Sequence, residues 1–249
     1  MKISIITVVF NNAAMIAQCI DSVLAQDYPD IEYIVVDGAS TDGTLDIIKK
    51  YGKKINTLIS EKDNGLYDAM NKGIISANGE LIGILNSDDF FYDSKVVSAI
   101  AAAFADESLD ATVADIVFVK RNTLDKVIRT YSSKNWRPAK FAWGYMPPHP
   151  SVFVRRSVLN DVGLYNTSYK IAADYELLIR CFKRQNFKWR YLPLITTKMN
   201  TGGKSTSGLK SLFVINKEIL RACYENQIAT NYMMIYSKYL FKPFEFLSR

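Results

Sequence analysis

The stretch that decides the fold opens the chain and reads Ile3-Ser4-Ile5-Ile6-Thr7-Val8-Val9, followed by Phe10-Asn11-Asn12. A run this rich in β-branched residues is typical of a strand buried on both faces, and the two asparagines predict a polar loop at its end. Residues 15–24 then carry apolar side chains at helical spacing, and a second buried run covers residues 31–36. The order strand, helix, strand predicts a parallel pair joined by a crossover helix.

The same alternation continues to about residue 85. Thr41 and Asp42 are expected to cap a helix that ends near Tyr51. A strand at 55–59, a helix at 66–77 and a strand at 81–85 follow. This pattern predicts an α/β fold in which helices cover both faces of a mostly parallel sheet.

The second half of the chain predicts a looser α+β arrangement. After a helix that ends near Ala105, strands are expected at 112–119 and 126–131, a helix at 173–184 and a strand at 187–192. Residues 136–150 are irregular, and the glycine- and serine-rich residues 201–208 predict a mobile loop. Two helical segments close the chain.

Composition excludes several classes of protein. With 49% hydrophobic and 22% charged residues among 249, the chain can bury a sizeable core and is not a disordered protein. Its formal charge of +6 favours an anionic partner. The three cysteines have no CxxC spacing, which argues against a disulfide framework or a zinc site. Without a signal peptide or a long apolar segment, the expected location is the cytoplasm.

Polar residues cluster where three predicted strands end. These clusters are Asn11-Asn12, Asp37-Gly38 and Asn86-Ser87-Asp88-Asp89. Ligands of open parallel sheets bind beyond the carboxyl ends of the strands, so these residues are the first candidates for a site. The pair Asp88-Asp89 suits Mg²⁺ or Mn²⁺, which prefer oxygen ligands and share them with phosphates.

Two common nucleotide-binding classes do not fit. No glycine precedes Gly38, so the GxGxxG turn of dehydrogenases is missing after the first strand. Residues 38–44 approach a P-loop, but Thr44 occupies the place of the phosphate-binding lysine. A dehydrogenase and a P-loop NTPase are therefore disfavoured.

Several motifs together resemble glycosyltransferase family 2. They are residues 4–12, Val35-Val36-Asp37-Gly38-Ala39-Ser40-Thr41-Asp42-Gly43-Thr44 and Asn86-Ser87-Asp88-Asp89. Residues 60–74 (Ser-Glu-Lys-Asp-Asn-Gly-Leu-Tyr-Asp-Ala-Met-Asn-Lys-Gly-Ile) are similar to a branch of that family found in bacterial surface-polysaccharide assembly. The resemblance implies a GT-A fold, a Rossmann-like nucleotide-binding sheet, over residues 1–205. It implies a donor half (1–95), an acceptor half (96–205) and a C-terminal helical tail (206–249).

The resemblance also implies roles for individual residues. Thr7 and Asp37 match positions that hold the base and ribose of a nucleotide sugar, and Phe10 and Asn11 belong to the same donor-binding motif. In the pair Asp88-Asp89, the second carboxylate is expected to hold Mn²⁺ or Mg²⁺ and the first to face the ribose.

Asp174 resembles the general base that takes a proton from the acceptor hydroxyl. Glu176 lies two residues away, on the acceptor side, and is the alternative base. Asp174 also fits the N-cap of its helix, where the helix dipole is expected to keep it ionised and to weaken it as a base.

Four further residues carry a functional and a structural interpretation. His149, the single histidine of the chain, is expected either to contact donor phosphate or acceptor, or to be structural. Arg155, beside Arg156, is expected to pair with the diphosphate or to lie on the surface. Lys204 is expected either to close over the donor as part of a lid or to lie in a solvated loop. Asp63 is expected either to hold the base or to cap the helix that follows.

The tail from residue 209 carries six Lys/Arg, three Glu and eight aromatic residues. Basic residues mixed with Tyr and Phe fit a helix lying on an anionic membrane, the location of lipid-linked acceptors. The alternatives are packing on the catalytic domain or on a second subunit in an oligomer.

The resemblance, together with the acidic residues at the strand ends, implies an inverting, metal-dependent glycosyltransferase of bacterial O-antigen, capsule or exopolysaccharide synthesis. The donor is expected to be UDP-linked, and the acceptor a glycan or an undecaprenyl-diphosphate-linked saccharide. The alternatives are an inactive carbohydrate-binding or scaffold protein of the same fold, and a sugar nucleotidyltransferase, whose glycine-rich basic loop is absent. No recognisable nucleic-acid-binding module occurs, which disfavours an RNA partner.

Overall fold

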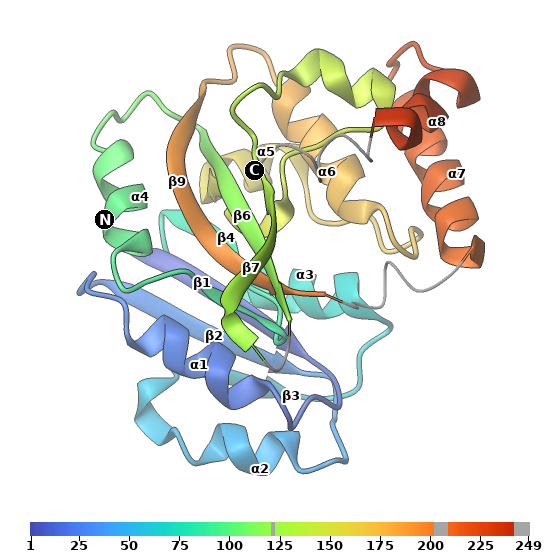
Figure 1. Cartoon of the computed structure of the whole chain (residues 1–249). Helices are drawn as coiled ribbons and strands as arrows, with labels where there is room; N and C mark the ends of the chain where they lie inside the picture. Colours follow the sequence, from blue (N-terminus) through green and yellow to red (C-terminus); the bar gives the residue numbers. More distant parts are fainter. Residues whose placement is uncertain (121–122, 202–208, 242–249) are drawn as a thin grey trace.

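The computed structural model describes residues 1–120, 123–201 and 209–241, and it contains the predicted parallel half of the sheet. The four strands of this half are β1 (Ile3–Val9), β2 (Ile31–Asp37), β3 (Thr57–Ser60) and β4 (Leu81–Ile84). They lie side by side in the order β3-β2-β1-β4 (Figure 1). Every residue of β1 is buried, as the uncharged opening stretch predicts.

Helices connect these strands and confirm the predicted alternation. They are α1 (Ile16–Leu24), α2 (Thr44–Lys49) and α3 (Leu66–Ser76), with a 3₁₀ helix, η1 (Gly52–Lys54), before β3. The predicted start of the second helix at Thr41 is too early. The chain first turns through Gly43, whose φ of 93° favours glycine, and Asp42 accepts the N–H of Thr44 at 3.0 Å.

The rest of the sheet is mixed. Its strands are β5 (Asp89–Phe91), β6 (Ala111–Lys120), β7 (Thr123–Tyr131), β8 (Phe153–Arg155) and β9 (Trp189–Asn200). The order continues from β4 through β8, β6 and β9 to β5, and β7 pairs with β6. β9 runs parallel to β6, whereas β5, β7 and β8 are antiparallel to the strands they pair with.

Two features of this half differ from the prediction. The strand expected to end at Leu192 continues to Asn200, because its pairing with β6 resumes after an irregularity near Asp115. Strands β5 and β8 were not predicted, because each has only three residues, too few to show a periodic pattern.

β4 and β8 approach each other closely. A Cβ at Gly83 would lie 2.3 Å from the Phe153 ring, so this position requires glycine.

Helices cover both faces of the sheet, as predicted. The remaining helices are α4 (Val96–Ala103), η2 (Pro138–Trp143), η3 (His149–Ser151), α5 (Arg156–Val162), α6 (Ala173–Lys183), α7 (Leu209–Glu225) and α8 (Tyr232–Phe241). One core cluster contains residues of α1, α2 and α4, among them Ile16, Ile48 and Val97. The other contains residues of α3, α5, α6, α7 and α8, among them Met70, Leu159, Ile179, Leu220 and Ile235.

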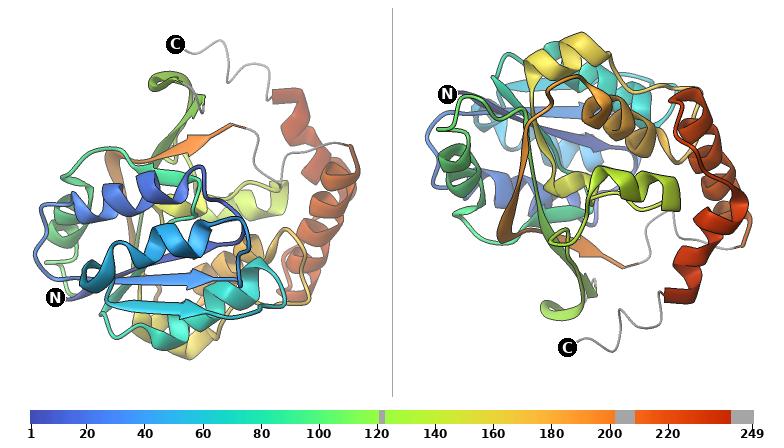
Figure 2. Two further views of the ribbon diagram at one scale, coloured as in Figure 1. Left: turned by 90° about the horizontal axis from the view of Figure 1, so that it is seen from below. Right: turned by 90° about the horizontal axis from the view of Figure 1, so that it is seen from above.

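Figure 2 shows α7 and α8 along one side of the molecule, beside α6 and away from α1 and α2. Both helices share the core cluster that α3 and α6 build, so they pack on the rest of the chain. The division at residues 95 and 205 stays a prediction. Within the described ranges, no helix is both long enough and apolar enough to span a bilayer.

Candidate active site

Three loops meet at the carboxyl ends of β1, β2 and β4, as the strand-end clusters predict. Asn11 receives the N–H of Thr41 on its Oδ1 and donates its own N–H to Ser40 Oγ, both at 2.8 Å. The Asn12 side chain donates to Ser87 Oγ at 3.0 Å. Asn11 has a φ of 48°, a left-handed conformation that asparagine tolerates better than most residues. These bonds bring the three polar clusters to one edge of the sheet.

Asp37 and Asp63 lie on one side of this edge. Asp37 ends β2 in full burial, and its carboxylate accepts Ser60 Oγ at 2.7 Å and the N–H of Ser40 at 3.2 Å. The Asp63 carboxylate lies so close to Gly38 that a Cβ there would be 2.4 Å from its Oδ2. Asp63 also accepts the N–H of Gly65, which turns the chain just before α3 without capping a residue of the helix itself.

Phe10 and Thr7 differ in access to this edge. A Cβ on Gly38 would lie 3.3 Å from the Phe10 ring, and half of Phe10 (52%) is exposed. Thr7 is completely buried and accepts the Tyr33 hydroxyl at 3.1 Å, beneath the edge and toward α1. The structure therefore brings Phe10 to the surface of the site and leaves the Thr7 side chain in the core.

Asp89 is a buried carboxylate at the centre of the edge. It begins β5, pairs with Met199 of β9 and is 2% exposed. Burial raises its pKa well above the ordinary value, and the neighbouring Asp88 charge raises it further. The groups that lower it are the Asn86 side chain, 3.4 Å away, and the backbone N–H of Asn200.

The surroundings of Asp89 fit a hard divalent cation. Asn86 Oδ1 and Asn200 Oδ1 are buried acceptors with no hydrogen-bond partner in the described part of the chain. Unpaired oxygens beside an uncompensated carboxylate are the donor set that Mg²⁺ or Mn²⁺ prefers. Among the described residues no cluster of three or more His, Cys, Asp or Glu is suited to a metal. A cation bound beside Asp89 would therefore need further ligands, such as phosphate oxygens and water.

Asp174 and His149 form a second polar pair across from Asp89. His149 Nδ1 lies 4.0 Å from Asp174 Oδ2, and His149 Nε2 lies 3.4 Å from the Asn86 side-chain nitrogen. Because Asn86 Nδ2 can only donate, Nε2 is the acceptor and the imidazole proton is on Nδ1, toward Asp174. Asn86 and His149 thus connect the environments of Asp89 and Asp174.

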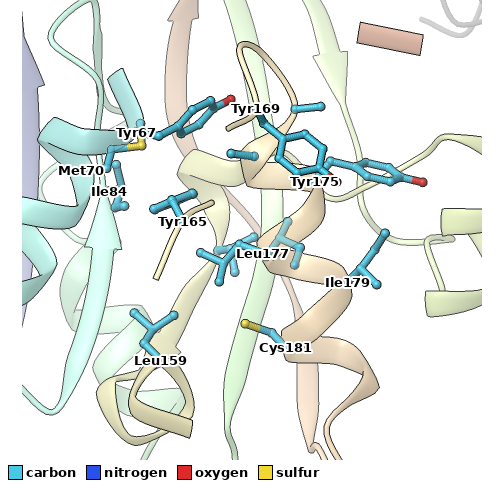
Figure 3. Packing of buried hydrophobic residues seen from close by; sticks show 14 of the residues in the cluster. Tyr67, Met70, Ile84, Leu159, Tyr165, Tyr169, Tyr175, Leu177, Ile179 and Cys181 are labelled. Atoms are coloured by element: carbon cyan, nitrogen blue, oxygen red, sulfur yellow. The ribbon is translucent and has the colours of Figure 1, made fainter. Parts of the chain in front are cut away.

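Burial shifts the pKa of both members of this pair. It raises the pKa of Asp174 to about 6 and lowers the pKa of His149 to about 4. A cavity of about 40 Å³ lies against both side chains and is lined by apolar groups such as Ile84, Leu159 and Leu177. Figure 3 shows these apolar residues gathered between α3, β4 and α6. Asp174 nevertheless keeps 22% of its side chain exposed, so a ligand can reach it.

The helix N-terminus acts on Asp174 in the expected direction but does not decide its pKa. The N–H of Tyr175 does donate to Asp174 at 2.8 Å and lowers its pKa, but burial outweighs this effect. At neutral pH the carboxylate is ionised, with a proton affinity well suited to a general base.

Glu176 points elsewhere. Its two oxygens each accept a 2.8 Å hydrogen bond from Arg180, one turn along α6. Arg180 also donates to the carbonyls of Val162 and Leu164, which ties Glu176 into a structural network. The structure thus separates the two candidate bases and leaves Asp174 beside His149.

Comparison with known proteins identifies the family. A family model described as "Glycosyl transferase family 2" matches residues 4–163. The chain belongs to glycosyltransferase family 2. A "PGL/p-HBAD biosynthesis glycosyltransferase" of Mycobacterium tuberculosis is 29% identical over 233 residues, which cover 88% of this chain and 82% of the relative.

Solved glycosyltransferases share the fold. S. aureus TarS 1-349 in complex with UDP-GlcNAc has a TM-score of 0.66 at 21% identity, over 89% of this chain and 66% of that chain. A mannosyltransferase of Pyrobaculum calidifontis in complex with GDP-Man and Mn²⁺ has a TM-score of 0.68 at 18% identity, over 98% of this chain and 68% of that chain. The chain spans 39% of a longer TarS chain. The fold of this family 2 glycosyltransferase is GT-A, as the sequence motifs predict.

One predicted donor contact of this glycosyltransferase, Arg155, is not brought to the site. Arg155 pairs with Leu81 at the beginning of β4 and donates to the carbonyls of Leu109 and Glu107. β8 runs antiparallel to β4, so its last residue lies at the opposite edge of the sheet from Asp89. We therefore propose no diphosphate contact for Arg155. Lys204 lies outside the described residues.

Sequence reasoning missed how α3 contacts residues 165–171. Asn71 donates to the carbonyl of Tyr165 and accepts its N–H, both at 2.9 Å. The rings of Tyr67 and Tyr165 stack with their centroids 5.5 Å apart, and the Tyr67 hydroxyl donates to the carbonyl of Ile171. The motif at residues 60–74 contains Tyr67 and Asn71, but their partners lie about 100 residues away and no local pattern predicts them.

Proposed function

We propose that this glycosyltransferase is an inverting, metal-dependent enzyme that transfers a sugar from a UDP-hexose or UDP-N-acetylhexosamine to a glycan or lipid-linked acceptor. The observation that carries the proposal is a pair of carboxylates, the buried Asp89 and the partly buried Asp174, on either side of Asn86 and His149. The acceptor class we propose is a bacterial O-antigen, capsule or exopolysaccharide intermediate on undecaprenyl diphosphate.

The donor is proposed to lie along the edge from Asp63 to Asp89. Asp37, Asp63, Phe10 and Asn11 would hold the base and ribose. Asp88 and Asp89 would hold Mn²⁺ or Mg²⁺. When bound, such a cation offsets the negative charge that develops on the departing diphosphate. The TarS and mannosyltransferase structures, which hold UDP-GlcNAc and GDP-Man, support a nucleotide-sugar donor.

Asp174 is proposed to act on the acceptor. Its carboxylate takes the proton of the acceptor hydroxyl while that oxygen bonds to the anomeric carbon and the bond to the diphosphate breaks. One displacement from the face opposite the leaving group inverts the anomeric configuration. His149 is proposed to orient Asp174 through the Nδ1 proton and to lie at the acceptor side, whereas Glu176 maintains the helix.

A donor panel tests this function. In a thermal-shift experiment with Mn²⁺, we expect one UDP-sugar at 100 times its Kd to raise Tm by about 5 to 10 °C, since binding at that level adds about 2.7 kcal/mol. GDP- and dTDP-sugars serve as matched controls. NMR of the product with that donor should show the inverted anomer. If no nucleotide sugar shifts Tm, the alternative of a non-catalytic carbohydrate-binding or scaffold protein is supported instead.

We further propose peripheral contact with the cytoplasmic face of the inner membrane through α8 and η2. Tyr232, Met233 and Tyr236 of α8 and Trp143 of η2 are 41–84% exposed, and α8 packs on η2. Exposed aromatic and apolar side chains of this kind insert at the headgroup level of a bilayer.

Vesicle sedimentation tests the membrane contact. We expect Met233→Glu combined with Tyr236→Glu to lower binding to phosphatidylglycerol vesicles by about tenfold. The control is Ile75→Glu, which changes an exposed residue of α3 (71%) and should leave binding unchanged. If the double variant instead turns an oligomer into a monomer, this surface binds a second subunit and the membrane proposal fails.

A further inference from the structure

Helix α6, which carries Asp174, has no capping side chain at its N-cap position. Its N-cap residue is Ala172 and its first helical residue is Ala173, and no side chain at the N-cap makes a capping hydrogen bond. The alanine side chain has no oxygen that could accept an N–H group at this position. The backbone N–H groups of the segment just before α6 find their acceptor elsewhere in the chain.

Glu218 of α7 supplies that acceptor. Its carboxylate receives the N–H groups of Lys170, Ile171 and Ala172 at 2.8, 2.9 and 2.9 Å. Glu218 is 9% exposed, so these charge-assisted bonds form away from bulk water. A residue about 46 positions later in the chain thus fixes the backbone immediately before the proposed base.

Neighbouring residues of α7 hold the same segment. Arg221 donates to Ser168 Oγ at 2.9 Å, and Glu225 accepts the Tyr169 hydroxyl at 2.6 Å. Residues 218, 221 and 225 are spaced by three and four, so they occupy one face of α7. On the other side, the Tyr67 hydroxyl donates to the carbonyl of Ile171. The segment 168–172 is clamped between α7 and α3.

α7 is itself anchored. Ile219, Leu220, Ala222 and Cys223 are buried in the core cluster that also contains Tyr175 of α6. Figure 3 shows Tyr169 and Tyr175 close to the start of α6 and Leu177 and Cys181 further along the same helix. The carboxylate of Glu218 therefore has a fixed position relative to Asp174.

The charge of Glu218 also acts on Asp174. After burial, which is the main cause, the Glu218 carboxylate raises the pKa of Asp174 further. The other titratable groups that face Asp174 are His149 of η3, Tyr67 of α3 and Tyr165 of the loop before α6. Burial keeps all three of these groups neutral at pH 7. Among the groups that face Asp174, Glu218 is therefore the one whose charge raises the pKa of Asp174.

We propose that Glu218 is a positioning residue for the transfer reaction: from α7 it holds the backbone that leads into α6 and thereby sets the place and the basicity of Asp174. The proposal rests on the proposed role of Asp174 as general base. It assigns to α7, which lies outside the part of the chain matched by the family model, a direct influence on the proton-transfer step.

The test is the pH profile of kcat/KM for Glu218→Gln. Glutamine keeps the size of the side chain and can still accept part of the hydrogen bonds from residues 170–172, but it removes the charge. We expect kcat to fall about 10- to 100-fold, the cost of a misplaced group. The acid limb of the profile should move to lower pH, while the donor KM stays unchanged. A purely structural residue would lower kcat without moving the acid limb.

Two further variants make the outcome decisive. Glu225→Gln removes a charge from the same face of α7 that contacts Tyr169, and it should leave the acid limb in place. Glu218→Asp keeps the charge on a shorter side chain, so it should restore the acid limb and keep a lower kcat. If Glu218→Gln does not fold, unchanged kcat in Glu218→Asp overturns the proposal.

Failure of this inference and failure of the proposed function are distinguishable. If Asp174→Asn is inactive but Glu218→Gln and Glu225→Gln have the same pH profile, the role of Glu218 is refuted and the base assignment stands. If Asp174→Asn retains near-normal transfer, the base assignment itself is refuted.

Discussion

Asp174→Asn is expected to lower kcat by about 10³-fold, because a positioned general base contributes roughly 10²- to 10⁴-fold to a transfer reaction. Asparagine keeps the shape of the side chain and can still accept the N–H of Tyr175, but it cannot take a proton. Donor binding should therefore stay within about twofold of the parent. Single-turnover transfer and donor calorimetry measure the two effects separately.

The pH dependence of the parent enzyme follows from the same residue. Since the pKa of Asp174 is raised to about 6, kcat/KM should fall as the pH drops below about 6. The folded state holds this proton more tightly than the unfolded chain, so stability falls as the pH rises from about 4 to about 6. At pH 7 the ionised Asp174 lowers the free energy of unfolding by up to about 3 kcal/mol. The Asp174→Asn variant should therefore be at least as stable as the parent at this pH.

Glu176→Gln is the matched control. It weakens the bonds with Arg180 and should lower Tm, but the acid limb of kcat/KM should stay where it is. Loss of transfer in Glu176→Gln with full transfer in Asp174→Asn would reverse the assignment of the base.

Asp89→Asn is expected to lower kcat by about 10³-fold and to abolish the Tm increase caused by Mn²⁺ with nucleotide. In the absence of metal, the variant should unfold at the same or a higher temperature than the parent at pH 7. Burial raises the pKa of Asp89, so the ionised side chain destabilises the metal-free fold as the pH rises, and asparagine removes that penalty. Thermal unfolding with and without Mn²⁺ measures both effects.

Asp93→Asn provides the comparison for this variant. Asp93 is exposed just beyond the end of β5, where it accepts the N–H of Lys95 at 2.8 Å. The Asp93→Asn variant should show the same increase in Tm with Mn²⁺ and nucleotide as the parent. Full activity of Asp89→Asn in the presence of a chelator would contradict the metal role.

The parallel half of the fold could be predicted because its signals are local. Each strand from β1 to β4 is a short apolar run followed by a polar loop, and the sheet topology then brings Asn11, Asp37 and Asp89 to one edge. The type and order of these elements follow from periodicity and end signals alone.

Other parts depend on contacts that no local pattern contains. Arg155 lies away from the site because β8 is antiparallel to β4, and a three-residue strand does not reveal its direction. The proton affinity of Asp174 follows from tertiary burial, which outweighs the effect of the helix end visible in the sequence. Asn71 and Glu218 have partners about 94 and 46 residues away. Such pairings become visible only when the helices are packed.

The clamp of α7 on the segment before α6 has a consequence for the divergence of related enzymes. If α7 were exchanged during the evolution of a related enzyme, the exchange would also replace the carboxylate that holds the segment before Asp174, the proposed base. Such an exchange would then alter the pH optimum, and hybrid enzymes assembled by recombination would need both helices from one parent.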